Sequence, residues 1–195
     1  EAYSAGVYYN PEFDTNKVRY GYNSMTTPSS VIDFDVDSKE KDVKKEQEIL
    51  GGKFDKANYE SERIWANGHD GTKIPISLVR HKNTELTKNT PLLMYGYGSY
   101  GHTIDAGFSS TRLSLLDRGF VFAIAHVRGS EYLGRHWYES GKLKQKKNTF
   151  HDFISCAKHL INIGYTSQEH LYASGGSAGG LLIGAVINME PTLFN

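Results

Sequence analysis

The stretch that decides the fold lies near the end of the sequence and reads Gly175-Gly176-Ser177-Ala178-Gly179. The pattern G-x-S-x-G is typical of a sharp turn that joins a strand to a helix and lifts its serine out of a sheet. The flanking residues fit this context, because a short apolar run, Leu171 to Ser174, precedes the turn and the apolar stretch Leu181 to Ile187 follows it. The sequence therefore predicts a buried strand, a turn that carries a nucleophile, and a buried helix that ends at Pro191.

The glycines beside Ser177 suit the strained backbone of such a turn. Gly175 and Gly179 leave room for the chain to turn, and we expect Gly180 to let the helix pack closely against the sheet. The first N–H groups of that helix point toward the site where an oxyanion develops when a serine attacks a carbonyl. Ser177 is therefore the candidate nucleophile and Ala178 supplies a candidate oxyanion donor. The flanking strand and helix disfavour the alternative, a glycine-rich turn with an incidental serine.

The groups that would activate Ser177 are missing from the residues after it. In the α/β-hydrolase fold the catalytic groups follow one another as serine, acid and histidine. No histidine follows Ser177 in this sequence, and Glu190 is the only acid there. We therefore expect an α/β fold that holds the N-terminal half of the parallel sheet of an α/β-hydrolase, cut off partway through its catalytic domain. The triad acid and histidine would lie outside this chain, which by itself would be inactive.

Composition excludes several functional classes. The 195 residues carry a formal net charge of zero, which argues against a nucleic-acid partner. Cys156 is the only cysteine, so no intramolecular disulfide can form and a reducing compartment is allowed. No apolar run reaches the roughly 18 residues of a membrane span, and the N-terminus lacks a signal-peptide pattern. We expect a cytoplasmic protein with no membrane partner, no cofactor and no metal. The histidines are interpreted as surface or structural residues, since His151 and His159 are not at metal-ligand spacing.

The pattern of apolar residues changes near residue 50. Before it, alternating segments such as Lys17 to Tyr22 and Val31 to Val36 predict antiparallel strands at the spacing of a propeller blade or a sandwich. Asp42 to Ile49 could form a third strand, and the stretch Lys39 to Glu48, rich in Lys and Glu, indicates a solvated hairpin edge.

Strands and helices alternate after residue 50. A hairpin is predicted over Tyr59–Ala66 and Lys73–Arg80, and buried strands are predicted over Pro91–Tyr95 and Phe120–Ala125. Helices are predicted over Thr111–Arg118 and Asn148–Ile163. This order implies a parallel sheet with crossover helices. The lysines at 142, 144, 146 and 147 are interpreted as a solvated stretch that leads into the second helix.

The loop Tyr95 to Gly101 is the second candidate piece of the site. It follows the first buried strand after the hairpin, the place from which this fold supplies another oxyanion donor. Its glycines permit tight turns, and a tyrosine hydroxyl could donate a hydrogen bond. A glycine- and tyrosine-rich loop that only packs on the core is an equally good interpretation of these residues.

Five separate motifs follow one another along the sequence: Tyr20–Pro28, Tyr95–Gly101, Arg112–Phe120, Lys146–Phe150 and Gly175–Gly180. In these motifs and in their order the sequence resembles the prolyl oligopeptidase family of serine peptidases, and within it the oligopeptidase B branch. The resemblance runs from about Tyr20 to the end of the chain.

The resemblance implies a β-propeller that caps an α/β-hydrolase domain. Residues 1–50 would be the last part of the propeller and residues 51–195 the first half of the hydrolase domain. The family's nucleophile corresponds to Ser177, its oxyanion tyrosine to Tyr97, and the partner N–H to Ala178. The implied activity is cleavage of short peptides after Arg or Lys. The implied partners are short basic peptides as substrates and the remainder of the protein's own polypeptide.

The resemblance also implies an acid that binds a basic substrate side chain, and it corresponds to Asp105. A loop-capping or solvent-exposed acid is the alternative interpretation of that residue. Two departures stand out: Gly107 occupies the position of a second acid, and Arg128 to Tyr132 occupy a stretch where the family tends to have a glycine run before its acid. Rival functions are an esterase or acylaminoacyl peptidase with the same turn, and a non-catalytic fragment or inactive homologue.

Overall fold

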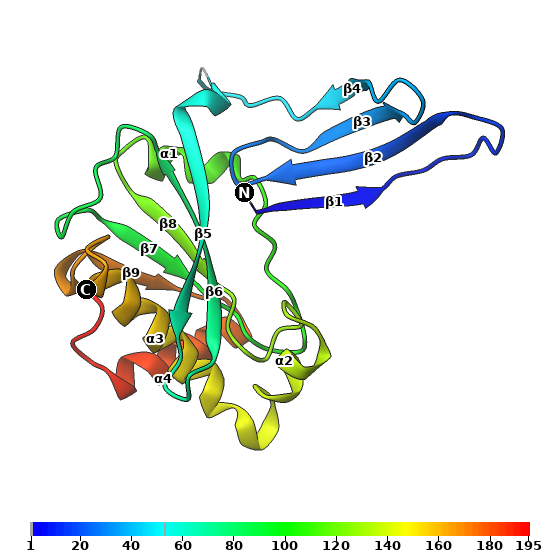
Figure 1. The fold of residues 1–195 in the computed structure, drawn as a ribbon. Coiled ribbons are helices and arrows are strands. Elements are labelled where there is room, and N and C mark those ends of the chain that lie inside the picture. Colours follow the sequence, from blue (N-terminus) through cyan, green and yellow to red (C-terminus); the bar gives the residue numbers. More distant parts are fainter. Residues whose placement is uncertain (1, 53) are drawn as a thin grey trace.

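The computed structural model describes residues 2–52 and 54–195, and its strands form two separate sheets (Figure 1). The first sheet is an antiparallel meander in the order β1-β2-β3-β4. Its strands are β1 (Tyr3–Val7), β2 (Lys17–Ser24), β3 (Ser30–Asp35) and β4 (Lys41–Glu46). Every residue of β4 is exposed, which confirms the predicted solvated edge.

The second sheet has the order β5-β6-β8-β7-β9 and mixes two strand directions. Its strands are β5 (Tyr59–Asn67), β6 (Lys73–His81), β7 (Leu92–Tyr95), β8 (Val121–Ala125) and β9 (Leu171–Ser174). The predicted hairpin of β5 and β6 is confirmed, and β6 pairs antiparallel with β8. Among the described strands β8, β7 and β9 run parallel, which confirms the parallel sheet expected from the alternation of strands and helices. The sheet is mixed because β6, a strand of the hairpin, pairs antiparallel with β8, which itself runs parallel to β7.

Helices cover both faces of the second sheet (Figure 1). They are α1 (Ser110–Leu116), α2 (Arg135–Glu139), α3 (Lys147–Asn162) and α4 (Ala178–Met189), with short 3-10 turns at Lys56–Asn58, Leu143–Gln145 and Gln168–His170. Alternate side chains of β6 point to opposite faces: Leu78 packs with α3 and α4, whereas Val79 packs with α1.

The helix α3 matches its predicted span within a residue at each end. Its buried face carries the apolar residues Phe153, Ile154, Ala157 and Leu160. Gly164 follows it with a φ of +80°, a conformation that suits glycine at a helix end.

The helix α4 is less buried than its apolar sequence predicts. Leu182 and Val186 are fully buried, but Leu181 is 59% exposed and Ile187 is 47% exposed. The helix contacts α3 and β9 along one stripe, so its other apolar side chains face outward in the described part of the chain. No helix among the described residues is both long and apolar enough to cross a membrane.

Candidate active site

Ser177 lies at the turn between β9 and α4, as the sequence predicts. Its backbone has φ 53° and ψ −120°, a region that residues with a side chain seldom occupy. The residue is exposed and takes the cap position of α4, yet its hydroxyl makes no capping hydrogen bond. Serine is a good helix cap, but the N–H groups of Gly179 and Gly180 already donate to the carbonyl oxygens of Gly176 and Ser177, so the Oγ of Ser177 stays available for other chemistry. No histidine or carboxylate bonds to it among the described residues.

Close packing of glycines holds this turn in place. A Cβ on Gly175 would lie 2.5 Å from the carbonyl oxygen of Gly179, and a Cβ on Gly179 would lie 2.7 Å from that of Gly96. Gly180, which we expected to allow the close packing, has only one atom nearby, at 3.9 Å. The expectation for Gly180 was wrong by one position, because the first turn of α4 directs Gly179 toward the loop after β7.

The two expected oxyanion donors lie on either side of this contact. The N–H of Ala178 donates to no atom in the part of the chain that the structure describes. Tyr97 follows Gly96, and its Cδ2 is 3.5 Å from the position where a Cβ on Gly179 would lie. The ring of Tyr97 meets His102 edge-on, with 5.3 Å between the ring centroids. The fold therefore brings Ser177, Ala178 and Tyr97 into one neighbourhood.

The loop that carries Tyr97 packs against α3 and against the loop after β8. Gly98 has a φ of +66°, and a Cβ there would lie 2.4 Å from Cγ2 of Thr149 and 2.7 Å from Cγ2 of Val127. Gly101 N–H donates to the carbonyl oxygen of Gly129 at 3.0 Å. Only glycine tolerates both this backbone conformation and so little space at position 98, so the close packing there allows the loop a single position.

Lys146 makes a direct contact with the same loop. Its Nζ donates to the carbonyl oxygen of Gly98 at 2.5 Å and to Oγ of Ser99 at 2.8 Å. Burial lowers the pKa of this ammonium. The interpretation of the lysine run as a solvated stretch was therefore wrong for Lys146, which is half-buried, and holds for the exposed Lys144 and Lys147.

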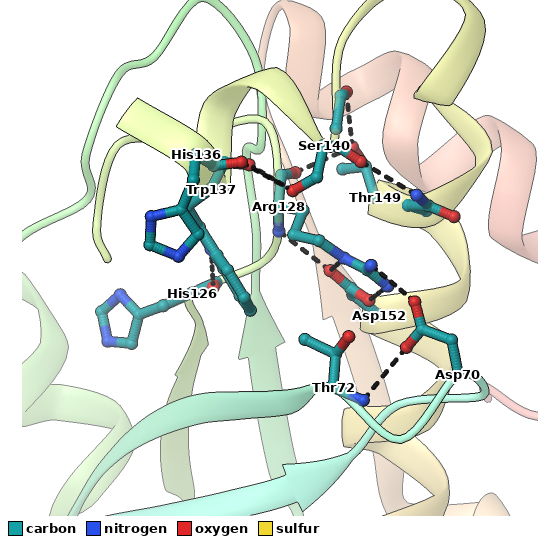
Figure 2. Close-up of polar contacts among 11 residues, drawn as sticks. Asp70, Thr72, His126, Arg128, His136, Trp137, Ser140, Thr149 and Asp152 are labelled. Atoms are coloured by element: carbon teal, nitrogen blue, oxygen red, sulfur yellow. Dashed lines mark hydrogen bonds and ion pairs between the residues drawn. The ribbon is translucent and has the colours of Figure 1, made fainter. Parts of the chain in front are cut away.

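Arg128 organises a buried polar network beneath these loops (Figure 2). Its guanidinium donates two hydrogen bonds to the carboxylate of Asp152, at 2.9 and 2.6 Å, and a third to Asp70 at 2.7 Å. Burial opposes the charge of Arg128, but the bonds and attraction of the two carboxylates outweigh it and raise the pKa of Arg128. Burial likewise opposes the charge of Asp70, yet the bonds from Arg128 and Thr72 lower its pKa.

The network fixes the backbone around Gly129. Arg128 N–H also donates to Asp152, while the hydroxyl of Thr149 donates to the carbonyl oxygen of Arg128 at 2.8 Å. Thr149 and Asp152 were absent from our expectations. A signal existed, since both are polar residues on the face of the predicted helix that also carries Phe153 and must be buried.

Asp105 lies apart from the contacts described above. It is exposed, and it makes no hydrogen bond or ion pair with the described residues. Its neighbour Ala106 is buried in the core that includes Met25. A Cβ on Gly107 would lie 2.9 Å from Oδ1 of Asn23 in β2, so any side chain there would have to displace that amide. Asp105 therefore stays a prediction whose partner the described residues do not include.

Ser130 and His126 both have partners within the described part of the chain. The hydroxyl of Ser130 is buried and donates to the carbonyl oxygen of Val127 at 2.9 Å, so the departure from the family's glycine run is satisfied internally. His126 is buried, lies 2.7 Å from the Oγ of Ser77 and stacks on Tyr132. The interpretation of histidines as structural residues fits His126. No group of three or more metal-binding side chains occurs among residues 2–52 and 54–195.

Comparison with known proteins points in one direction. Residues 106–195 match the model of the prolyl oligopeptidase family. The chain is 48% identical over 191 residues to dipeptidyl aminopeptidase BI of Pseudoxanthomonas mexicana, a match that covers 97% of this chain and 26% of that protein. It is 43% identical to protease 2 of Moraxella lacunata, covering 98% of this chain and 28% of the relative.

Solved structures give the same result. The structure of oligopeptidase B from Trypanosoma brucei with covalently bound antipain, in a closed form, superposes with a TM-score of 0.89 at 48% identity and covers 99% of this chain. Oligopeptidase B from Leishmania major superposes with a TM-score of 0.88 at 43% identity. The chain spans 28% and 27% of these two proteins, so it corresponds to about a quarter of their length.

Proposed function

Because the chain belongs to the prolyl oligopeptidase family, we propose that the protein carrying it is a serine peptidase that cleaves short peptides through an acyl-enzyme on Ser177. The observation that supports this best is the backbone of Ser177, strained at φ 53°, exposed, and free of any capping bond. Strain of this kind persists where the surrounding structure enforces it, and the contact of Gly175 with Gly179 does so here.

The chemistry follows from what surrounds the nucleophile. Ser177 Oγ attacks the scissile carbonyl carbon, and the carbonyl oxygen gains negative charge as the tetrahedral intermediate forms. The N–H of Ala178, which donates to no atom in the described part of the chain, and the hydroxyl of Tyr97 would donate to that oxygen. One such donor contributes about 3–4 kcal/mol to transition-state stabilisation in comparable sites. The serine proton then passes to a histidine, which returns it to the leaving amine.

That histidine and its acid would come from the remaining polypeptide. In this proposal residues 1–50 close a β-propeller, and residues 51–195 supply the first half of the hydrolase domain. The antiparallel meander β1 to β4 supports the first assignment, and the run of β5 to α4 supports the second. The share of about a quarter that the chain spans in its relatives agrees with this division.

We further propose a preference for Arg or Lys before the scissile bond. The support is the likeness to oligopeptidase B and the exposed, unpaired carboxylate of Asp105 in the described structure. A carboxylate selects a guanidinium or an ammonium through charge-assisted hydrogen bonds. A cytoplasmic location is part of the same proposal, since Cys156, the only cysteine, is buried as a free thiol.

The proposal is tested on the full-length protein with a fluorophosphonate probe and with peptide amides of Arg, Lys and Pro. We expect labelling and hydrolysis in the wild type, and a loss of turnover of at least about 10⁴-fold in Ser177→Ala. Ser155→Ala on α3 is the matched control and should label normally. Hydrolysis by Ser177→Ala at the wild-type rate would refute the assignment, and faster cleavage of the Pro amide would refute the basic preference.

A second candidate is the release of dipeptides from a free N-terminus. The observation that favours it is the 48% identity to a protein named as a dipeptidyl aminopeptidase. Mass analysis of the products from one peptide with a free N-terminus and from its acetylated form separates the two functions. Cleavage of both peptides at the same bond supports the oligopeptidase, whereas dipeptides released only from the free form support the alternative.

A further inference from the structure

Lys146 is a half-buried cation, and its hydrogen-bond partners among the described residues are all uncharged. Its Nζ donates to the carbonyl oxygen of Gly98 and to the hydroxyl of Ser99, and it lies 5.9 Å from the centroid of the Phe150 ring. No carboxylate forms an ion pair with it in the described part of the chain. Two other lysines, Lys142 and Lys158, by contrast form ion pairs with Glu139 and Glu190.

The partial burial of Lys146 lowers the stability of the folded protein, so we expect its contacts to serve another purpose. An ammonium taken partly out of water loses hydration, and two neutral acceptors repay it less well than a carboxylate would. The lowered pKa of Lys146 has this desolvation as its cause. The fold nevertheless directs the side chain from the start of α3 to the loop that carries Tyr97.

The contact falls at the middle of that loop. Gly98 follows Tyr97 directly, and its carbonyl oxygen is packed so tightly that a Cβ on Gly129 would lie 2.1 Å from it. Steric contacts fix the loop on the side of Thr149 and Gly129, and the hydrogen bonds of Lys146 fix the direction of the Gly98 carbonyl. The peptide plane between Gly98 and Ser99, one residue beyond Tyr97, is thereby set, and it constrains the direction in which the backbone leaves Tyr97.

We propose that Lys146 is a positioning residue for the oxyanion site, acting through the Gly98 carbonyl to hold Tyr97 where its hydroxyl meets the developing negative charge. This inference rests on the proposed function of Ser177 and Tyr97 and adds a residue that touches neither substrate nor nucleophile. A misplaced donor loses its stabilisation of the transition state while substrate binding is largely retained, because the oxyanion exists only during reaction.

The test compares Lys146→Met, Lys146→Arg and Lys147→Met in the full-length protein. Lys146→Met removes hydrogen bonds that involve a charged donor, so we expect kcat to fall roughly 10- to 100-fold with KM changed less than about twofold. Lys146→Arg keeps a charged donor and should recover part of the loss. Lys147→Met, an exposed neighbour at the first position of α3, is the matched control and should keep the wild-type kcat.

A double-mutant cycle with Tyr97→Phe distinguishes positioning from a general structural role. If Lys146 acts through Tyr97, Lys146→Met should lower kcat much less in the Tyr97→Phe background than in the wild type. Equal losses in both backgrounds, or an unchanged kcat in Lys146→Met, would overturn the proposal.

Hydrogen exchange keeps the proposal testable if the proposed function fails. The amide of Gly101 is protected by its bond to Gly129, so exchange of the peptide covering residues 96–102 reports on the loop without any substrate. We expect faster exchange in Lys146→Met and wild-type exchange in Lys147→Met. A wild-type protein that hydrolyses no peptide would refute the peptidase assignment alone, whereas unchanged exchange in Lys146→Met would refute the role of Lys146.

Discussion

At the scale of single residues, His126 gives the molecule a dependence on acid. Burial, aided by the charge of Arg63, lowers the pKa of its imidazole from 6.5 to about 3. Between these pH values the unfolded chain binds a proton that the native state does not, so stability falls as pH decreases through the window. Acidification from pH 7 to pH 4 should cost about 3 kcal/mol through this group.

Urea unfolding of wild type and His126→Gln at both pH values measures this effect. Gln keeps an acceptor for Ser77, whose Oγ lies 2.7 Å from Nε2 of His126 and accepts a bond from Nε of Arg63 at 3.1 Å. The wild type should lose more stability on acidification than the variant does. An equal loss in the two proteins would show that another group dominates the acid response.

The sequence predicts those residues of the candidate site whose type is restricted by the backbone conformation. Ser177 and the glycines beside it were found because a strained turn permits few residue types. Lys146 was not found, because four lysines in one short run look alike until tertiary structure buries one of them against Gly98. Arg128 and Asp152 were missed for a related reason, since an ion pair joining a loop to a helix leaves no local pattern.

At the scale of elements, the contact between α4 and the loop after β7 sets the position of Ser177, the proposed nucleophile. Gly179→Ala would place a methyl group 2.7 Å from the carbonyl oxygen of Gly96, so the helix or the loop must shift. Overpacking of this kind costs about 1–3 kcal/mol, and a displaced turn should also lower kcat. Gly180→Ala is the matched control, because its nearest atom is 3.9 Å away and alanine favours a helix by up to about 1 kcal/mol.

Thermal melting and hydrolysis rates of the two variants test this contact. We expect a lower Tm and a lower kcat in Gly179→Ala, and a Tm equal to or above that of the wild type in Gly180→Ala. The reverse order would restore our original assignment of the close packing to Gly180.

The helices and strands were predictable where the spacing of their apolar residues reflects contact with the core. The hairpin, β7, β8, β9 and α3 were confirmed because their apolar periodicity records contact with a core. The strand β1 was missed because its residues are largely exposed and show no alternation. The helix α2 spans only Arg135–Glu139, and its buried Trp137, whose Nε1 donates to the carbonyl oxygen of His126, holds it by a tertiary contact. The burial of α4 was overestimated because an all-apolar sequence cannot say which of its sides has a partner.

At the scale of the whole molecule, the described chain leaves apolar surface without a partner in two places. On α4, Leu181 and Ile187 are exposed, next to the edge strand β9 of the second sheet. On the first sheet, β1 and the segment that follows it expose Val7, Tyr9 and Phe13. Apolar patches and an unpaired strand edge favour association with other chains. We therefore expect these 195 residues, expressed alone, to self-associate at micromolar concentration.

Light scattering after size-exclusion chromatography measures the mass of that species against the 21.8 kDa of the single chain. Replacing Leu181 and Ile187 by Glu should lower the associated fraction if the α4 surface contributes, whereas Lys144→Glu at an exposed polar position should leave it unchanged. The same two substitutions should destabilise the full-length protein if its remaining polypeptide covers α4, because buried carboxylates without partners are costly. A monodisperse 195-residue chain that melts cooperatively would instead show that one helix stripe and one mixed sheet suffice for a stable fold.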